Sequence, residues 1–333
     1  MSRYPSNVLM NLILLAALML AGCGSGAGQV APSDQAATLT RQAGSTEASE
    51  ATTSALETEA PEAVTEPLPA GTETPEPTQA PEPSPTVDTR LPPEEWRDWP
   101  IIPTLSPSML EVYQRGQQMG NDPNAFSVVG DCQNIPPVFM GRYDSPGTYI
   151  LPDENGYLQD TIDQFAGSFE RYGYALHGGF TFPSIFSPMR ADPNYCDSGE
   201  TPLECEFRIH RPVIAFISME AWYSGRTTES YERYLRQAVE YALSRGIIPI
   251  LATKADHAER DNSIGIAIAR AAYDYQVPLW NFWLAVQPLP AHGLDWESDP
   301  SGFQLTEAGF YMRGFTALQV LDALWREILA ASP

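Results

Sequence analysis

Aromatic residues are distributed so unevenly along this chain that they define where a hydrophobic core can form. Between Gly24 and Glu95 there is no Phe, Trp or Tyr, whereas Trp96 and Trp99 begin a remainder that is rich in them. The aromatic-free stretch repeats Thr, Glu, Ala, Pro and Ser and cannot bury enough apolar surface to offset its chain entropy. We therefore expect a disordered stalk over residues 24–92 and one folded domain over residues 93–333, a usual size for an α/β domain.

The charge balance excludes several classes of partner. The formal net charge is −23 at pH 7, and the chain has a single lysine, Lys254, against eighteen arginines. Nucleic acids and anionic lipid surfaces require a cationic face, so we expect no nucleic-acid partner. The sequence also lacks a glycine-rich phosphate loop, a zinc-ligand spacing and a dinucleotide fingerprint, and so predicts neither a cofactor nor a metal ion.

The amino-terminal segment resembles a bacterial lipoprotein signal. Residues 8–21 are almost wholly apolar, too short to span a bilayer comfortably, and run into Leu20-Ala21-Gly22-Cys23. This sequence is similar to a lipobox, which implies that residues 1–23 carry the signal, that cleavage occurs just before Cys23 and that Cys23 is diacylated. The alternative is an ordinary secretory signal with a coincidental cysteine. Both interpretations predict export, and the lipobox predicts a lipid anchor that holds the domain at the extracytoplasmic face of the cell membrane.

Short apolar runs alternate with helical patterns through the second part of the chain. Strands are expected at residues 126–130, 212–219, 247–252 and 277–281, and helices at residues 106–120, 157–172, 228–245, 262–275 and 306–329. Continuous apolar strands between helices are typical of a parallel sheet that is covered on both faces. The sequence therefore predicts an α/β fold, a three-layer α/β/α sandwich with a central parallel sheet.

Two of the four cysteines lie close together in the sequence. Cys196 and Cys205 flank a loop that contains Gly199 and Pro202. In an exported protein a disulfide between them is the simplest assignment, and loop-closure entropy makes it worth roughly 2 to 3 kcal/mol. That pairing leaves Cys132 unpaired, although pairing of Cys132 with either of the other two stays open because sequence does not fix connectivity.

The first expected strand ends in a tight turn, Gly130-Asp131-Cys132. This Gly-Asp-Ser-like sequence resembles the nucleophile turn of the SGNH (GDSL-type) hydrolases, with Cys132 at the position of the family's serine. Gly178-Gly179-Phe180-Thr181 is similar to the second block of that family, which implies that the Gly179 amide contributes to an oxyanion hole. The order of strands and helices from Phe126 onward also matches the family and implies an SGNH/flavodoxin-like sandwich.

The remaining catalytic positions of that family carry unsuitable residues here. The resemblance places Ser301 at the position of the aspartate and Gln304 at the position of the histidine that deprotonates the nucleophile. Glutamine has no titratable nitrogen and cannot act as a base. Glu220 stands where the family's third block has an asparagine. A carboxylate there repels an oxyanion, and losing even one donor costs roughly 3 kcal/mol of barrier.

These departures favour a surface-anchored binding module that no longer hydrolyses esters, with envelope or extracellular carbohydrate as the expected partner. Trp222, Tyr223, Trp280, Trp283 and Trp296 are candidates for an aromatic floor under sugar rings, and the alternative is that most of them belong to the core. A third interpretation is an architectural surface protein whose old cleft is closed by side chains such as Phe303 or Trp222.

The alternative function is a cysteine-nucleophile esterase or acyltransferase that acts on acylated glycans. A thiolate needs less help from a base than serine does, and His257 or His292 could supply that base from the expected edge of the sheet. Asp131, however, would raise the pKa of the neighbouring thiol. Asp299 is a candidate for the missing orienting carboxylate, and the plainer interpretation is a loop acid that precedes the last helix.

Overall fold

The computed structural model describes residues 90–220, 226–256 and 258–331. The signal segment, Cys23 and all but the last residues of the stalk lie outside these ranges, as do Trp222, Tyr223 and His257. No helix in the described part combines the length and the apolar character that a membrane span requires.

Four parallel strands form the centre of the described domain, in the order β1-β2-β3-β4. They are β1 (Asp122–Gly130), β2 (Pro212–Ser218), β3 (Ile248–Ala252) and β4 (Leu279–Trp280). β2 and β3 are buried along their whole length, as strands are when helices cover both faces of a sheet. Ile217 of β2 pairs with Val129 of β1 and with Leu251 of β3. All four strands therefore end at the same edge of the sheet.

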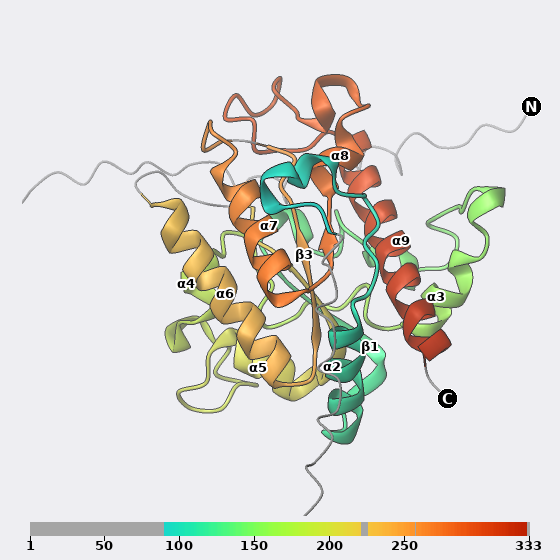
Figure 1. The fold of residues 1–333 in the computed structure, drawn as a ribbon, viewed down its shortest axis with the longest axis vertical. Helices are drawn as coiled ribbons and strands as arrows, with labels where there is room; N and C mark the ends of the chain where they lie inside the picture. Colours follow the sequence, from blue (N-terminus) through green and yellow to red (C-terminus); the bar gives the residue numbers. More distant parts are fainter. Residues whose placement is uncertain (1–89, 221–225, 257, 332–333) are drawn as a thin grey trace, which may run out of the picture. The chain divides into compact units, whose positions relative to one another are not determined.

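Helices cover this sheet on both sides. Figure 1 shows α6 and α7 on one side of the strands and α9 on the other. The helices of the described part are α2 (Pro107–Gln118), α3 (Leu158–Gln164), α4 (Phe182–Ile185), α5 (Pro202–His210), α6 (Thr228–Ser244), α7 (Ser263–Tyr275), α8 (Phe282–Val286) and α9 (Glu307–Ala331). Three of the short 3-10 turns matter below: η2 (Pro93–Asp98), η3 (Cys132–Asn134) and η7 (Pro290–Gly293). The predicted three-layer α/β/α arrangement is confirmed.

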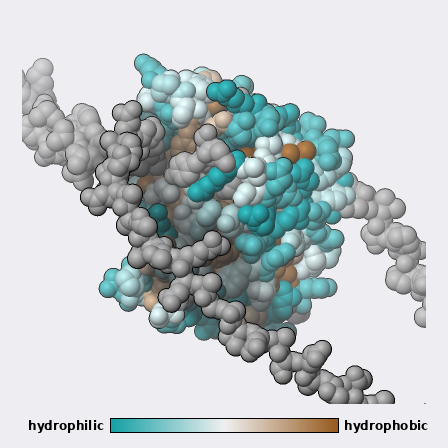
Figure 2. Space-filling view, turned by 90° about the vertical axis from the view of Figure 1, so that its left-hand side faces the viewer, coloured by the Kyte–Doolittle hydropathy of each residue, from teal (hydrophilic) through white to brown (hydrophobic). Residues whose placement is uncertain are grey.

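The solvent side of the α6 layer is polar. In Figure 2 the face over α4 and α6 is mainly hydrophilic where described residues are visible. α6 buries one apolar stripe, formed by Tyr231, Leu235, Ala238, Val239 and Ala242. Its other side carries charged residues such as Arg233 and Glu240, both exposed. This division is the one expected of a helix that packs one face on a sheet.

The helix predicted for residues 157–172 is wrong in its second half. α3 ends at Gln164, and Gly167 has a positive φ of 87°. The carboxylate of Asp144 accepts hydrogen bonds from the backbone amides of Gly167 (2.7 Å) and Glu170 (2.8 Å). A continuing helix would use those amides internally, so the side chain of a distant residue ends the helix.

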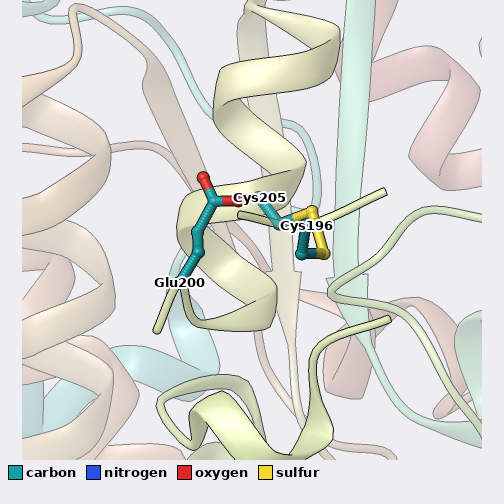
Figure 3. Close-up of side chains that lie close together, drawn as sticks. All are labelled: Cys196, Glu200 and Cys205. Atoms are coloured by element: carbon teal, nitrogen blue, oxygen red, sulfur yellow. A yellow bond between two sulfur atoms is a disulfide. The ribbon is translucent and has the colours of Figure 1, made fainter. Parts of the chain in front are cut away.

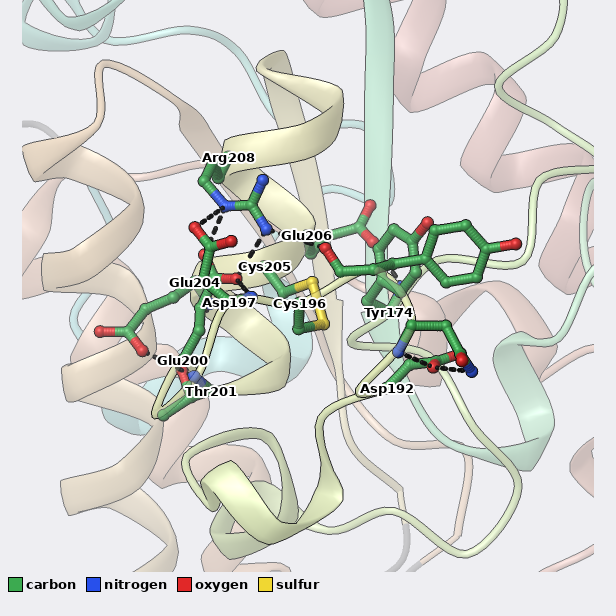
Figure 4. The surroundings of a disulfide bond; sticks show 12 residues. Tyr174, Asp192, Cys196, Asp197, Glu200, Thr201, Glu204, Cys205, Glu206 and Arg208 are labelled. Atoms are coloured by element: carbon green, nitrogen blue, oxygen red, sulfur yellow. Dashed lines mark hydrogen bonds and ion pairs between the residues drawn. A yellow bond between two sulfur atoms is a disulfide. The ribbon is translucent and has the colours of Figure 1, made fainter.

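Cys196 and Cys205 are paired, as predicted, with their Cα atoms 5.2 Å apart. Cys205 lies within α5, a helix that the sequence analysis missed. The signal for it is a capping box, in which Thr201 accepts a hydrogen bond from the amide of Glu204 (3.3 Å) and Glu204 accepts one from the amide of Thr201 (2.8 Å). Figure 4 shows these residues around the disulfide.

One cluster of metal-type ligands occurs among the described residues, formed by Cys196, Glu200 and Cys205 (Figure 3). The two sulfur atoms are bonded to each other, and the Glu200 carboxylate accepts two hydrogen bonds from Arg208, each of 2.8 Å (Figure 4). The hydrogen bond from Arg208 holds the pKa of Glu200 below its usual value. The cluster therefore has a structural role, because its ligand atoms are already engaged.

Candidate functional site

The residues that follow the strands converge at the carboxyl edge of the sheet. Asp131 follows β1 directly, Glu220 follows β2, and Lys254 follows β3. Proteins with open parallel sheets bind ligands beyond this edge. All three residues are buried, with 0%, 2% and 5% of their surface exposed. Charged groups buried to this degree require partners, and those partners decide what the edge can do.

The turn after β1 is held by Asp131. Its carboxylate accepts hydrogen bonds from the backbone amide of Gln133 (3.1 Å) and from the side-chain amide of Asn134 (3.2 Å). Gly130 has no room for a side chain, because a Cβ atom there would lie 2.7 Å from the Cβ atom of Asn134. The sharp turn places Cys132 at the edge of the sheet, in η3.

The segment that resembles the family's second block runs beside this turn. The Gly130 carbonyl accepts a hydrogen bond from the amide of His177 (3.3 Å), and a Cβ atom on Gly178 would lie 3.8 Å from the Cβ atom of Cys132. Gly179 is exposed and has a φ of 83°. The structure thus brings Cys132 and this glycine pair together, while a role of Gly179 in an oxyanion hole stays a prediction.

Cys132 is not an unpaired thiol. Its sulfur belongs to a disulfide bond, and there is no free cysteine among the described residues. The expectation that Cys132 is left unpaired is therefore not met, and the pairing with Cys196 or Cys205 that stayed open is excluded because those two are bonded to each other. A sulfur in a disulfide offers no thiolate for attack on a carbonyl.

The loop between η7 and α9 brings Ser301 and Gln304 toward the same turn. The Gln133 side chain donates a hydrogen bond to the Phe303 carbonyl (2.6 Å). The carboxylate of Asp299 accepts hydrogen bonds from the Ser301 hydroxyl (2.6 Å) and from three backbone amides of the loop at 2.9 to 3.0 Å. Burial acts to raise the pKa of Asp299, but these hydrogen bonds outweigh it and lower the pKa. Asp299 therefore organises the loop backbone, and the family's histidine position holds an amide side chain.

Glu220 is paired with an arginine that the sequence analysis did not single out. The Nη2 atom of Arg313, on α9, lies 2.7 Å from the Oε1 atom of Glu220. The same nitrogen donates to the Ser218 hydroxyl (2.6 Å) and to the side-chain oxygen of Asn134 (2.8 Å). Asn134 in turn donates to the Ser218 carbonyl (3.0 Å). This network joins the ends of β1 and β2 to the last helix.

Three aromatic rings surround the Arg313 guanidinium. Its central carbon lies 4.7 Å from the ring centroid of Phe282, 5.2 Å from that of Trp280 and 5.7 Å from that of Phe139, all within cation–π distance. Trp280 is fully buried, so this candidate for an aromatic floor belongs to the core. The Nε and Nη1 atoms of Arg313 and the Oε2 atom of Glu220 have no hydrogen-bond partner within the described part of the chain.

The ion pair changes what this end of the sheet can do chemically. A site that stabilises an oxyanion needs donors that remain available to the substrate. Here the Nη2 atom of Arg313 already serves three acceptors, and Glu220 contributes a negative charge. The sequence holds one signal for this pair, which is the position of Arg313 on the apolar stripe of α9. It lies one turn from Gly309 and one turn from Ala317, which are both buried. A charge on such a stripe requires a buried counter-charge.

A second buried cation lies beyond β3. The ammonium of Lys254 lies 3.0 Å from the Asp256 carboxylate and 2.9 Å from that of Glu259. Burial alone would lower the pKa of Lys254, but the two carboxylates outweigh burial and raise it. Burial also raises the pKa of Asp256, although Lys254 opposes that shift. The only lysine of the chain is therefore a charged part of the core.

His292, one of the candidate bases, lies in η7, where its Nδ1 atom is 3.1 Å from the Gln287 carbonyl oxygen. It lines an open pocket of about 260 Å³ together with Trp283 and Trp296. This pocket lies beyond β3 and β4, because Ala255 and Trp283 on its wall follow those strands. Among the residues predicted to form an aromatic floor, Trp283 and Trp296 thus lie together at this pocket.

These observations define the class: an α/β domain with a parallel sheet whose carboxyl edge has two unlike halves. We call the ends of β1 and β2, with Asp131, Glu220 and Arg313, the inner half of the edge. The outer half lies beyond β3 and β4 and contains the pocket with Trp283 and Trp296.

Comparisons with known proteins give similarities in chain path at low identity. A G-D-S-L family protein from Desulfitobacterium hafniense DCB-2 has a TM-score of 0.40 and 15% identity, over 59% of this chain and 99% of its own. A GDSL-like lipase from Bacteroides thetaiotaomicron VPI-5482 has a TM-score of 0.40 and 12% identity, over 64% of this chain and 97% of its own. No protein-family model matches the sequence, and no curated protein does.

Proposed function

We propose that the domain is a non-hydrolytic binding module that retains an SGNH-like architecture and has lost ester chemistry. The observation that carries this proposal is the buried ion pair between Glu220 and Arg313 in the inner half, with a separation of 2.7 Å. An ester hydrolase must stabilise negative charge that develops on the substrate oxygen. A carboxylate at this position opposes that charge, and the arginine that balances it is fully buried in the core.

The residues at the other catalytic positions support the same proposal. Gln304 cannot accept a proton at neutral pH, and Ser301 uses its hydroxyl to bond Asp299. The polar groups of this loop therefore organise its backbone and cannot transfer a proton to or from a substrate. Cys132 supplies no thiolate while its sulfur is in a disulfide.

Carbohydrate is the partner class that best fits the outer half. Tryptophan offers a large apolar face together with an N–H donor, a combination that suits a sugar ring with one apolar face and polar edges. Trp283 and Trp296 both line the open pocket. The net charge of −23 disfavours nucleic acid as the partner.

Turnover of p-nitrophenyl acetate tests the loss of ester chemistry. We expect the full-length protein to hydrolyse this ester no faster than its Cys132→Ala variant, both before and after reduction with dithiothreitol. Iodoacetamide labelling in the same samples reports whether the sulfur of residue 132 is reactive in each state. Turnover by the wild type well above that of Cys132→Ala would overturn the proposal.

We also propose that the protein is exported. An anchor through a lipid on Cys23 requires that Cys23 is not the disulfide partner of Cys132, since Cys196 and Cys205 pair with each other. The lipobox-like sequence and the Cys196–Cys205 disulfide, a bond of oxidising compartments, support this location. Mass spectrometry of non-reduced protein from the membrane fraction tests it. A diacylated amino-terminal Cys23 supports the anchor, and a Cys23 peptide that is cross-linked or carries no lipid overturns it.

A further inference from the structure

The pocket of the outer half is built from segments that are far apart in the sequence. Its wall includes Arg97 of η2, Asn262 before α7, Trp283 and Gln287 at α8, His292 of η7 and Trp296. Its volume of about 260 Å³ lies below the usual range for drug-sized ligands and suits a ligand of about one ring. Neither Cys132 nor Glu220 lines it, so this pocket is separate from the position of the lost ester chemistry.

Both tryptophans of the pocket are fixed by their surroundings. The ring of Trp283 meets that of Trp96 edge to face, with the centroids 5.3 Å apart. Trp296 is 48% exposed and packs on Gly302, where a Cβ atom would come within 2.2 Å of the ring. Gly302 belongs to the loop that Asp299 organises. The loop that Asp299 organises therefore holds the exposed ring of Trp296 beside the pocket.

Polar side chains of the pocket wall keep hydrogen-bonding capacity within the described part of the chain. Arg97 is exposed, and its guanidinium lies 5.3 Å from the ring centroids of Trp96 and Trp283. Within the described residues that guanidinium has neither a hydrogen-bond acceptor nor a carboxylate partner, and the Asn262 side chain does not cap α7. None of the described residues that line the pocket is acidic, although the chain as a whole is strongly acidic. The wall thus presents one guanidinium that can pair with an anion.

The backbone of the same wall adopts unusual conformations. Asn262, Ala291 and His292 have φ values of 57°, 50° and 54°. Such conformations in residues with side chains cost about 1–3 kcal/mol each in sparsely populated regions and cluster at ligand clamps. Three of the six non-glycine residues with positive φ in the described chain line this one pocket.

We propose that this pocket binds a single acidic sugar residue, a pyranose that carries a carboxylate. This inference rests on the proposed binding function and assigns its ligand. The apolar face of the ring packs against Trp296 and Trp283, the carboxylate pairs with Arg97, and Asn262 and His292 bond the ring hydroxyls. One guanidinium without a carboxylate partner in the described part of the chain matches one carboxylate, and guanidinium–carboxylate pairing can be bidentate.

Binding of three matched glycosides to the full-length protein tests the assignment. Saturation-transfer NMR and calorimetry are applied to methyl β-D-glucuronide, its uncharged amide and methyl β-D-glucoside. We expect the glucuronide to bind about tenfold more tightly than the other two, because a hydrogen-bonded charge pair is worth about one decade. Arg97→Gln should remove this preference, and Trp296→Ala should weaken all three glycosides by about tenfold or more.

A second pocket supplies matched control variants. It has a volume of about 320 Å³ and is lined by Arg142 and Tyr311, with the guanidinium 5.9 Å from the tyrosine ring centroid. Arg142→Gln and Tyr311→Ala remove a similar charge and ring, and they should leave binding of the glucuronide unchanged. This result would support the assignment to the outer half.

The opposite results separate this inference from the proposed function. Equal affinity for the three glycosides would overturn the acidic sugar but not carbohydrate binding. Unchanged binding in both Arg97→Gln and Trp296→Ala, or loss of binding in the control variants, would overturn the pocket. Binding of none of the glycosides would overturn the inference, while the ester assay decides the loss of catalysis independently.

Discussion

The two halves of the carboxyl sheet edge use polar side chains in opposite ways. In the inner half the groups bond one another, and Arg313 alone contacts Glu220, Ser218 and Asn134. In the outer half Arg97 and His292 surround open space. The difference teaches that polar residues at such an edge offer a binding site only where they border open space. Arg313 is fully buried, even though its Nε and Nη1 atoms lack a partner among the described residues.

Arg313→Met should produce the largest effect, because it leaves Glu220 buried without its counter-charge. We expect a loss of about 3–5 kcal/mol in the free energy of unfolding, measured by urea denaturation. Arg326→Met is the control, since Arg326 lies on the same helix with its side chain 41% exposed and pairs with Asp322 and Asp160. Its loss should be about 1 kcal/mol or less. Equal costs for the two variants would contradict a locked inner half.

Lys254→Met should cost somewhat less and should depend on pH. We expect a loss of about 2–3 kcal/mol at about pH 8, because Asp256 loses its partner in a buried place. Burial already raises the pKa of Asp256, and without the lysine that pKa rises further above its unfolded value. A raised carboxyl pKa favours the folded state at low pH and loses that stability as pH rises through the folded value. The deficit should therefore shrink toward about pH 5, and a deficit independent of pH would show that Asp256 does not carry it.

Asp299→Asn tests the loop that adjoins both halves. The variant should lose about 1 kcal/mol, as other losses of a backbone-capping carboxylate do. Hydrogen bonds lower the pKa of Asp299 below its unfolded value, so its contribution is present above about pH 3.9 and is lost as pH falls through the folded pKa. Thermal unfolding by circular dichroism between about pH 5 and about pH 2 should thus fall less steeply in the variant than in the wild type. Parallel curves would contradict this role.

Arg97→Gln should have the smallest effect on stability. The exposed guanidinium has no acidic partner among the described residues, so the free energy of unfolding should change by no more than about 0.5 kcal/mol. Urea denaturation beside the Arg313→Met variant makes the comparison direct. A loss of several kcal/mol would mean that the outer half is held together by its polar groups, as the inner half is.

The strands and the long helices could be predicted from local patterns. Continuous apolar runs indicated β1, β2 and β3, and Thr228 to Ser244 follows the helical period closely enough to predict α6 within one residue at its end. The errors came from side chains that act over a distance. Asp144 ends α3 from outside the helix, and no pattern within residues 157–172 records that contact.

The candidate site could be predicted only in part. The resemblance indicated Glu220 and Gln304 as departures, but the meaning of Glu220 depends on Arg313, which is 93 residues away in sequence. Trp280, Trp283 and Trp296 were all candidates for an aromatic floor, but Trp280 lies in the core, whereas Trp283 and Trp296 line the open pocket. Only the fold shows that Trp283 and Trp296 border open space, whereas Trp280 packs against the buried guanidinium of Arg313.

The burial of Lys254 affects how the molecule reacts with its surroundings. Neutral side-chain amines attack aldehydes, reducing sugars and acylating reagents, and the chain has one lysine, with 5% of its surface exposed. The raised pKa keeps that amine protonated and unreactive. Amine-reactive cross-linkers and reducing sugars, which modify ordinary proteins through surface lysines, should therefore leave Lys254 unmodified.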